Sequence, residues 1–140
     1  MEQRYLLDIV HDRHPLVLPP DATVQEACRG MQKQRVGAVL VAEGGDRLVG
    51  IFTGRDAVGR VLAAGRDPVK TRLAEVMTPK PDTLPPGKTA IEALRLMSDG
   101  GYRHVPVVEK NKLIGIISRG DFRAVEEARL DEETGLWQRI

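Results

Sequence analysis

This sequence of 140 residues has few aromatic side chains, a single cysteine and almost no excess of charge of either sign. With one Trp, two Tyr and two Phe, a core must be built from aliphatic side chains. A single cysteine, Cys28, excludes an intramolecular disulfide and fits a reducing, cytoplasmic compartment. The 21 basic and 20 acidic residues give a net charge of +1, which argues against a nucleic-acid partner, since such a partner needs a basic surface.

Long apolar runs are also missing. No run approaches the roughly 18 residues of a membrane-spanning helix, and residues 1–10 lack the apolar stretch of a signal peptide. We therefore expect no membrane partner. Hydrophobic residues make up 41% and charged residues 29% of the chain, proportions that are typical of a globular protein with one ordinary domain or two very small ones.

What the sequence does contain is the same segment twice. Residues 15–31 align with residues 81–97 at an offset of 66, and nine of the 17 positions are identical. The offset falls to 65 after an extra residue near Gly45, so that Asp56 aligns with Asp121. A duplication of this length indicates two copies of one structural unit.

Each copy predicts the order strand, helix, two strands and helix. A Pro-Pro pair ends an extended segment, and Thr23-x-x-Glu26 or Thr89-x-x-Glu92 is typical of a capping box at the start of a helix. Apolar residues at helical spacing follow, namely Val24, Ala27, Cys28 and Met31, or Ala90, Ala93, Leu94 and Met97. Two apolar runs then predict a hairpin, over 38–42 and 48–52 in the first copy and 105–108 and 113–117 in the second. The second helix is expected to begin near Asp56 or Asp121.

These patterns predict an α/β (α+β) fold made of two tandem βαββα repeats. One such unit is small for independent stability, so we expect the two to pack sheet to sheet with pseudo-two-fold symmetry. That symmetry predicts two equivalent clefts between the copies, which are favoured places for ligands. The predicted divisions are repeat 1 over 6–64, a linker over 65–72, repeat 2 over 73–128 and a C-terminal extension over 129–140. Apolar residues of the extension that could dock on this chain or on a second one are Leu130, Leu136, Trp137 and Ile140.

Several segments resemble those of the CBS-domain pair, also called a Bateman module, of the stand-alone type. They are Val76-Met77-Thr78-Pro79, Thr89–Ala93, His104–Val108, Gly50-Ile51-Phe52-Thr53-x-x-Asp56 and Gly115-Ile116-Ile117-Ser118-x-x-Asp121. The resemblance implies a regulatory module, not an enzyme, that binds AMP, ADP, ATP, NAD or S-adenosylmethionine and requires no cofactor. It also implies a homodimer, a ligand-dependent change in the arrangement of the repeats or of that dimer, and a regulated protein that the sequence does not identify. The alternative is a ligand-free module for dimerisation or protein interaction.

The resemblance also implies two sets of ligand-binding residues. Asp56 and Asp121, the last residues of the two Gly-Ile-x-[Thr/Ser]-x-x-Asp motifs, would hold the ribose hydroxyls. The Thr or Ser three residues earlier would lie near ribose and phosphates. Backbone groups of the strand that begins at His104, or of its counterpart in the first copy, would line the adenine pocket. The set of repeat 2 is Thr83, Arg103, His104, Val105, Pro106, Ser118, Arg119, Gly120 and Asp121. The set of repeat 1 is Val17, Gly37, Ala38, Val39, Thr53, Arg55 and Asp56. The second set has more polar side chains, so we expect it to be the better site.

The chemistry of these residues fits that assignment without the family name. A carboxylate can accept hydrogen bonds from two vicinal hydroxyls, and charge-assisted bonds are the stronger kind. The planar fork of arginine matches phosphate oxygens. An apolar slot with a few fixed polar contacts suits adenine.

Other interpretations of the same residues stay open. Thr53 with Asp56, and Ser118 with Asp121, also fit a helix cap. Ser118, His104 and Asp121 have the residue types of a catalytic triad, but no strained nucleophile turn accompanies them, so we predict no catalytic residue.

Three further features have simple structural interpretations. His11, Asp12 and His14 are weak evidence for a metal site, and we predict a solvated loop and no metal there. Cys28 lies on the apolar face of its helix and is predicted to be buried. Of five arginines, most are expected to be solvated, namely Arg55, Arg66 and Arg72. The exceptions are Arg103 and Arg119, which are expected to contact the ligand.

Overall fold

The structure, a computed structural model, describes the backbone of residues 3–139 and the side chains of residues 3–132. The chain divides into two compact units. The repeat-1 unit comprises His14–Asp82 and Lys110–Leu113. The repeat-2 unit comprises the residues up to Arg13, Thr83–Glu109 and the residues from Ile114 onward.

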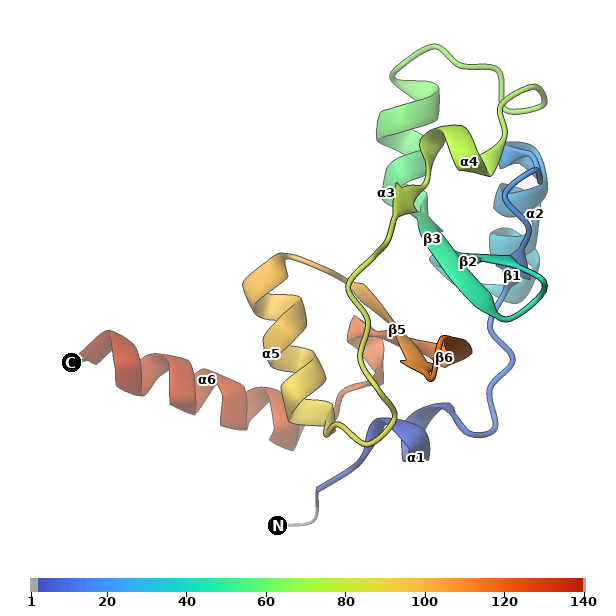
Figure 1. Cartoon of the computed structure of the whole chain (residues 1–140). Helices are drawn as coiled ribbons and strands as arrows, with labels where there is room; N and C mark the ends of the chain where they lie inside the picture. Colours follow the sequence, from blue (N-terminus) through green and yellow to red (C-terminus); the bar gives the residue numbers. More distant parts are fainter. Residues whose placement is uncertain (1–2, 140) are drawn as a thin grey trace. The chain divides into compact units, whose positions relative to one another are not determined.

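A four-stranded sheet in the order β1-β2-β3-β4 forms the centre of the repeat-1 unit. β1 (Val17–Leu18) pairs in parallel with β2 (Ala38–Glu43), β2 forms an antiparallel hairpin with β3 (Arg47–Thr53), and β3 pairs with β4 (Thr78–Pro79). The helices of this unit are α2 (Val24–Gln34), α3 (Gly54–Asp56), the π-helix η1 (Ala57–Leu62) and α4 (Leu73–Val76) (Figure 1). The predicted hairpin and the predicted first helix are therefore confirmed.

The local chemistry of α2 explains its bounds. The Thr23 hydroxyl accepts a hydrogen bond from the Glu26 backbone N–H at 3.2 Å, as the capping pattern predicts. At the other end Arg35 has a φ of 56° and closes the helix in the left-handed conformation. The apolar face of α2 packs with β2 and β3 into an aliphatic core around one buried aromatic ring, Phe52.

The repeat-2 unit contains the second hairpin, β5 (His104–Glu109) with β6 (Lys112–Ser118). A parallel bridge between Leu84 and Val107 takes the place of the β1–β2 pairing. Its helices are α1 (Leu6–Val10), α5 (Ala90–Gly100), the 3-10 turn η2 (Arg119–Asp121) and α6 (Ala124–Arg139). The capping box of α5 is complete, because Thr89 and Glu92 each accept from the other's backbone N–H.

The last helix begins later than predicted. The chain makes one 3-10 turn at Asp121, and α6 starts at Ala124. α6 packs against α5 and includes the predicted extension over 129–140 as far as Arg139, and Leu130 is 8% exposed. The predicted docking side chains Leu136, Trp137 and Ile140 lie outside the described residues. Over the described part of the chain, no helix combines the length and the hydropathy that crossing a membrane requires.

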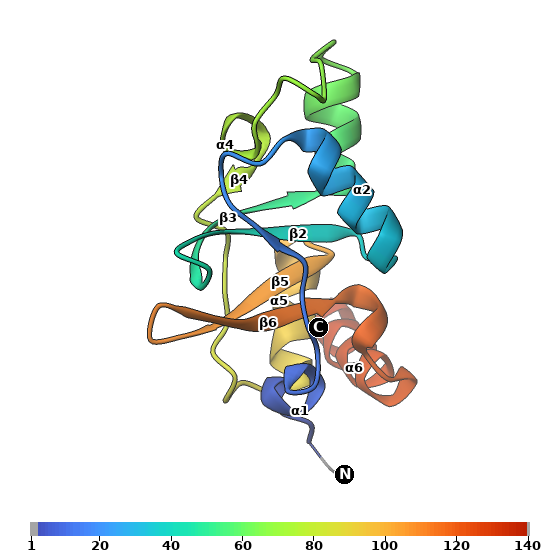
Figure 2. The same ribbon diagram turned by 90° about the vertical axis from the view of Figure 1, so that its right-hand side faces the viewer.

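Two short helices are exchanged between the repeats. α1 lies at the start of the predicted repeat 1 (6–64), but Leu6, Ile9 and Val10 belong to the core of the repeat-2 unit. α4 lies at the start of the predicted repeat 2 (73–128), but Leu73 and Val76 belong to the core of the repeat-1 unit. Figure 2 shows α1 beside α5, and α4 beside the start of α2. Each unit therefore completes its core with a helix from the other repeat's side of the sequence.

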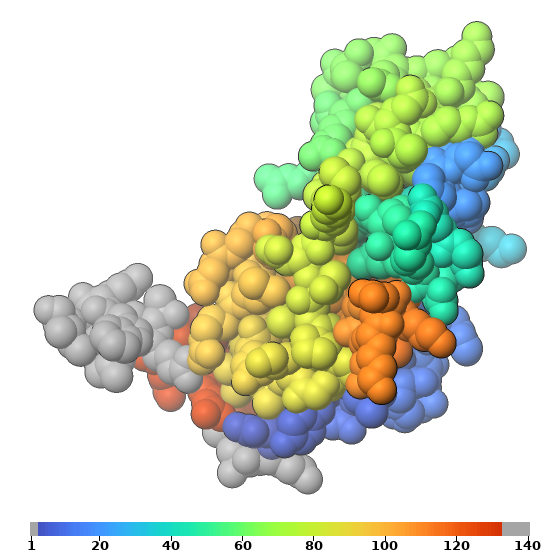
Figure 3. All heavy atoms as spheres, in the orientation of Figure 1, coloured from blue at the N-terminus to red at the C-terminus, as the bar shows by residue number. Residues whose placement is uncertain are grey.

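Backbone hydrogen bonds near the N-terminus of α5 hold α1 in place, and matching bonds near the N-terminus of α2 hold α4. In the repeat-2 unit, Leu6 donates to the Lys88 carbonyl at 2.9 Å and Ala90 donates to the Arg4 carbonyl at 2.8 Å. The blue N-terminal segment accordingly lies against the yellow start of α5 in Figure 3. The repeat-1 unit has the matching pair, Leu73 to the Ala22 carbonyl at 2.9 Å and Val24 to the Thr71 carbonyl at 3.0 Å.

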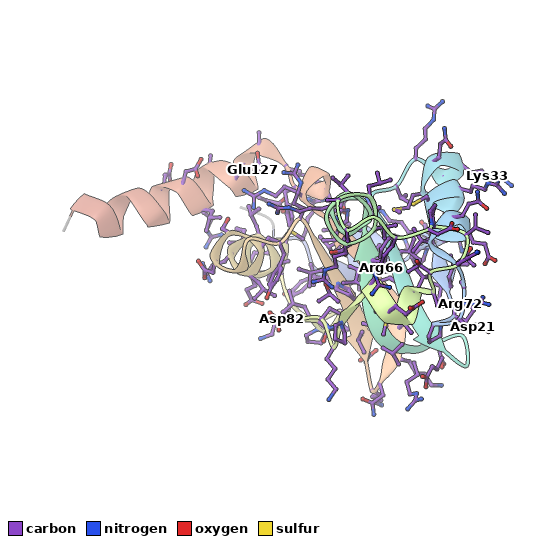
Figure 4. The ribbon with its side chains drawn as sticks, turned by 90° about the horizontal axis from the view of Figure 1, so that it is seen from above. Asp21, Lys33, Arg66, Arg72, Asp82 and Glu127 are labelled. Carbon is purple, nitrogen blue, oxygen red and sulfur yellow. The ribbon has the colours of Figure 1, made fainter. Side chains whose placement is uncertain are left out.

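Arg72 adds a side-chain bond to the junction in the repeat-1 unit. Its Nη1 donates to the Asp21 carbonyl at 2.6 Å, and the two residues are labelled in Figure 4. The compact units thus differ from the divisions predicted from the repeats. The segment 65–72, predicted as a linker, packs within the repeat-1 unit, where Thr71 is 5% exposed. Residues 73–82 also belong to that unit.

Glycines at equivalent positions leave room for the exchanged segments. A Cβ atom on Gly50 would lie 3.1 Å from the Thr78 carbonyl oxygen and would overlap the Met77 side chain, just after α4. A Cβ atom on Gly115 would lie 2.8 Å from the Cβ of Val10, at the end of α1. The glycine of each ending is therefore needed for close packing of the other repeat's short helix.

We expect Gly115→Val to lower the free energy of unfolding by about 1–3 kcal/mol, because the new methyl groups overlap Val10 in a packed core. Urea denaturation followed by circular dichroism measures the change. Gly54→Ala is the control, since no atom lies within 4 Å of the position that its new Cβ would take, and it should change stability by less than about 0.5 kcal/mol. Equal losses in the two variants would contradict the packing argument.

Candidate functional site

The two predicted acids occupy the same place in the two units, one turn after the last strand of each hairpin. In the repeat-1 unit, Asp56 Oδ2 accepts from the Thr53 N–H at 2.9 Å and from the Thr53 hydroxyl at 3.1 Å. In the repeat-2 unit, Asp121 Oδ2 accepts from the Ser118 N–H at 2.7 Å and from the Ser118 hydroxyl at 3.2 Å. The helix-cap interpretation is therefore confirmed as the local geometry, and it fixes the orientation of both carboxylates.

The other oxygen of each carboxylate faces an arginine. Asp56 Oδ1 lies 3.6 Å from Nε of Arg60, four residues along the same helical segment. Asp121 Oδ1 lies 2.7 Å from Nη1 of Arg13, which comes from the N-terminal segment. The two acid side chains are 15% and 12% exposed. A carboxylate oxygen with one hydrogen bond can accept another, so each acid can still bind a hydroxyl.

Backbone pairing brings the start of each hairpin to the acid at its end. The Gly54 N–H donates to the Gly37 carbonyl at 3.1 Å, and Ala38 pairs with Thr53 in the β2–β3 ladder. The Arg119 N–H donates to the Arg103 carbonyl at 2.9 Å. The predicted residues 37–38 and 103–104 therefore lie next to the cap of the same unit, as the sequence repeat implies.

His104 is a titratable side chain at the start of β5, in the repeat-2 unit. Burial lowers the pKa of His104, the positive charge of Arg103 lowers it further, and Asp121 acts in the opposite direction. The imidazole is consequently neutral at pH 7, with one nitrogen as a donor and one as an acceptor. A neutral ring of this kind suits a flat, uncharged base better than a phosphate.

The remaining predicted residues are placed in different ways. Val39 and Val105 are 0% and 1% exposed and belong to the cores of their units, so only their backbone groups can meet a ligand. Pro106 is buried, and its carbonyl accepts from the Leu84 N–H at 3.1 Å. The exposed residues of the two sets are Gly37, Arg55, Thr83, Arg103 and Gly120, and the two glycines among them offer only backbone groups.

Two predicted residues are directed to other partners. Arg119 Nη1 donates to the Ser98 hydroxyl at 3.2 Å, toward the end of α5. Val17 pairs with Leu40 of β2 and lines a surface pocket with Leu18, the two prolines after it and residues 42–45. The register of β2 separates that pocket from Ala38, which pairs beside the cap of Asp56.

Three arginines that contact Asp56 or Asp121 were not among the residues predicted from the sequence. Arg60 had a usable signal, since it follows Asp56 at the helical spacing of four. Arg13 and Arg4 had none, because they reach Asp121 from the opposite end of the chain. Arg4 Nη2 donates to the Asp121 carbonyl at 2.9 Å and binds the Glu126 carboxylate.

The geometry also tests the alternative interpretations. The Ser118 hydroxyl donates to Asp121, so its proton is directed at the acid and not at His104, unlike the nucleophile of a triad. His11 Nε2 lies 2.9 Å from Asp12 Oδ2 on an exposed loop, and among the side chains described no group of three or more His, Cys, Asp or Glu could hold a metal ion. Cys28 is half-buried, which is less than predicted, and burial raises the pKa of its thiol.

Known proteins match this chain in sequence and in fold. The family model described as "CBS domain" matches residues 7–63 and 73–127. The CBS domain-containing protein CBSCBSPB3 of Arabidopsis thaliana is 39% identical over 102 residues, which are 73% of this chain and 18% of that protein. The chain thus spans about a fifth of that relative's length.

Two solved structures share the fold over most of the chain. The CBS domain protein PAE2072 from Pyrobaculum aerophilum, complexed with AMP, superposes with a TM-score of 0.81 at 26% identity and covers 91% of this chain and 98% of its own. A hexameric CBS-CP12 protein from bloom-forming cyanobacteria superposes with a TM-score of 0.76 at 27% identity, covering 86% of this chain and 67% of its own.

Proposed function

Because the chain belongs to the CBS-domain family, we propose that it is a regulatory module, without catalysis of its own, that binds an adenine nucleotide. The candidates are AMP, ADP, ATP, NAD and S-adenosylmethionine. The observation that carries the proposal is the matching geometry of Asp56 and Asp121, each held by its cap with one oxygen able to accept from a sugar. The AMP complex of the Pyrobaculum aerophilum protein supports the ligand class.

The repeat-2 set is the proposed principal site. Asp121 would take the ribose hydroxyls, and the neutral His104 with the backbone at Val105 and Pro106 would meet the adenine. Ser118 and Gly120 would lie near the sugar, with Thr83, Arg103 and Arg119 at the edge. The repeat-1 set, centred on Asp56, offers the same acid with fewer polar neighbours and is proposed as the weaker site.

Ligand binding would be communicated to a regulated protein. We propose a ligand-dependent change in the arrangement of the repeats or of a homodimer, and a nucleotide can shift that equilibrium only by its different affinities for the two states. Oligomeric CBS proteins such as the cyanobacterial hexamer support an assembly of copies. We infer a cytoplasmic location, where the single thiol of Cys28 would remain reduced.

Asp121→Asn tests the proposed function. The amide oxygen can still accept from Ser118, but the charge that would hold the ribose is lost, so AMP affinity should fall by about 10- to 100-fold. Titration calorimetry measures the affinity, and a thermal-shift panel of the five candidate ligands identifies the one that raises the melting temperature most.

Asp99→Asn is the matched control for Asp121→Asn. It removes the same charge from an exposed position on α5 of the same unit and should leave the affinity unchanged. Equal affinities of the wild type and Asp121→Asn for the nucleotide would contradict the role given to Asp121.

A ligand-free interaction module is the second candidate. Val58 and Leu62, four residues apart on η1, are 61% and 68% exposed, and apolar side chains at this exposure favour a protein contact. The same thermal-shift panel decides between the candidates. A stable dimer by light scattering, with no shift from any adenine ligand at millimolar concentration, would favour this one.

A further inference from the structure

The contact between Arg13 and Asp121 is a close ion pair at an open position. Its N–O distance is 2.7 Å, the Asp121 side chain is 12% exposed, and the Arg13 side chain is 46% exposed. A guanidinium has five N–H donors in a planar fork, and the contact with Asp121 uses Nη1. Donors of Arg13 therefore remain available to a second acceptor while the first contact is kept.

A carboxylate that holds a ribose creates a difficulty for a nucleotide. The phosphates are attached to the same sugar, so they must come near a group of like charge, and that repulsion weakens binding. A cation in contact with the carboxylate cancels the repulsion and can also bind the phosphate through its fork. Arg13 is placed for both tasks.

Two other arginines of the repeat-2 unit, Arg4 and Arg119, have different partners. Arg4 uses Nε and Nη2 on the Glu126 carboxylate and the Asp121 carbonyl. Arg119 donates to Ser98. In the repeat-1 unit the corresponding acid has a looser contact, 3.6 Å, with Arg60 of its own helix.

We propose that Arg13 is the residue that makes the repeat-2 site selective for phosphorylated adenosine over adenosine itself. The inference rests on the proposed function, because it requires that Asp121 bind the ribose. It assigns a specificity role to the N-terminal segment, which the sequence repeats place outside repeat 2. It concerns adenosine 5′-phosphates as a class and therefore covers AMP, ADP and ATP alike.

The test is titration calorimetry of the full chain with adenosine and with AMP. An Asp56→Asn background weakens the repeat-1 site, so that the repeat-2 site dominates the signal. In that background Arg13→Ala should lower the affinity for AMP about tenfold or more, the effect of losing a charge-assisted hydrogen bond, and should change the affinity for adenosine less than twofold. Arg13→Lys, which keeps the charge without the fork, should fall between the two.

Arg47→Ala is the matched control, because it removes one positive charge from the exposed pair with Glu43 on the β2–β3 hairpin and should change neither affinity. An equal loss for adenosine and AMP in Arg13→Ala would overturn the inference and make Arg13 a positioning residue for Asp121. A gain for both ligands would overturn it as well, since the arginine would then compete with the sugar. If the starting protein binds neither ligand, the proposed function fails and the inference fails with it.

Discussion

Leu6→Ala is expected to lower the free energy of unfolding by about 2–5 kcal/mol, the range for truncating a fully buried leucine. Leu6 is 0% exposed and packs in the core of the repeat-2 unit with α5 and β5. Truncation removes its buried methyl groups and leaves a cavity that α1 and α5, held by the backbone bonds around Thr89, cannot easily close. Urea denaturation measures the loss.

The segments that Leu6→Ala destabilises show whether α1 packs in the repeat-2 unit or with its own repeat. Hydrogen exchange of Leu6→Ala should accelerate in α5 and β5 of the repeat-2 unit, and less in α2 and β2. Leu7→Ala is the control, because Leu7 lies next to Leu6 in α1 but is 49% exposed, so its truncation should cost less than about 0.5 kcal/mol. Faster exchange confined to α2 and β2 would show that α1 packs with its own repeat.

Arg4→Ala should cost about 3–5 kcal/mol, because it leaves a buried carboxylate without its cation. Glu126 is 5% exposed and accepts from Arg4 Nη2 at 2.6 Å and from Arg4 Nε at 3.1 Å. The Arg123 backbone N–H, at 2.8 Å, would remain as a partner of that carboxylate. Thermal and urea unfolding of the variant against the wild type measure the loss.

Two comparisons separate the buried pair from surface charge. Arg66→Ala breaks an exposed pair with Glu75 at 3.3 Å and should cost less than about 1 kcal/mol. The double variant Arg4→Met with Glu126→Met replaces both charges with apolar chains and should recover most of the loss. A loss for Arg4→Ala no larger than for Arg66→Ala would contradict the assignment.

The buried pair also predicts a dependence on pH. Burial alone would raise the pKa of Glu126, but hydrogen bonds from Arg4 and from the Arg123 N–H outweigh it and hold the pKa below its usual 4.5. The hydrogen bond to Glu126 raises the pKa of Arg4, which stays charged throughout. A depressed carboxyl pKa stabilises the fold above pH 4.5, and this contribution is lost as the pH falls through the folded-state value. In Arg4→Ala this part of the acid destabilisation should be smaller.

The amount that could be predicted differs between the fold and the site. The hairpins and the start of α2 and α5 were predictable because capping residues and apolar periodicity act over a few neighbouring residues. The hydrogen bonds between Thr53 and Asp56 also join residues only three apart, and the helix cap that they form was one of the interpretations that the sequence left open. The ribose role of Asp121 remains a proposal, because a carboxylate that only caps a helix and one that also binds a ligand have the same sequence.

Taken alone, the amino-acid sequence determined that two copies of one α+β unit are present, where their hairpins lie, and which acid ends each copy. Tertiary structure decided that α1 and α4 are exchanged, that Gly50 and Gly115 make room for them, and that Arg13 and Arg4 reach Asp121. The physical reason is range. Helix capping and apolar periodicity depend on residues that are close in the sequence. A short helix of four or five residues carries no sequence signal for the place where it packs. An ion pair between residues near the two ends of the chain forms only when folding brings those ends together.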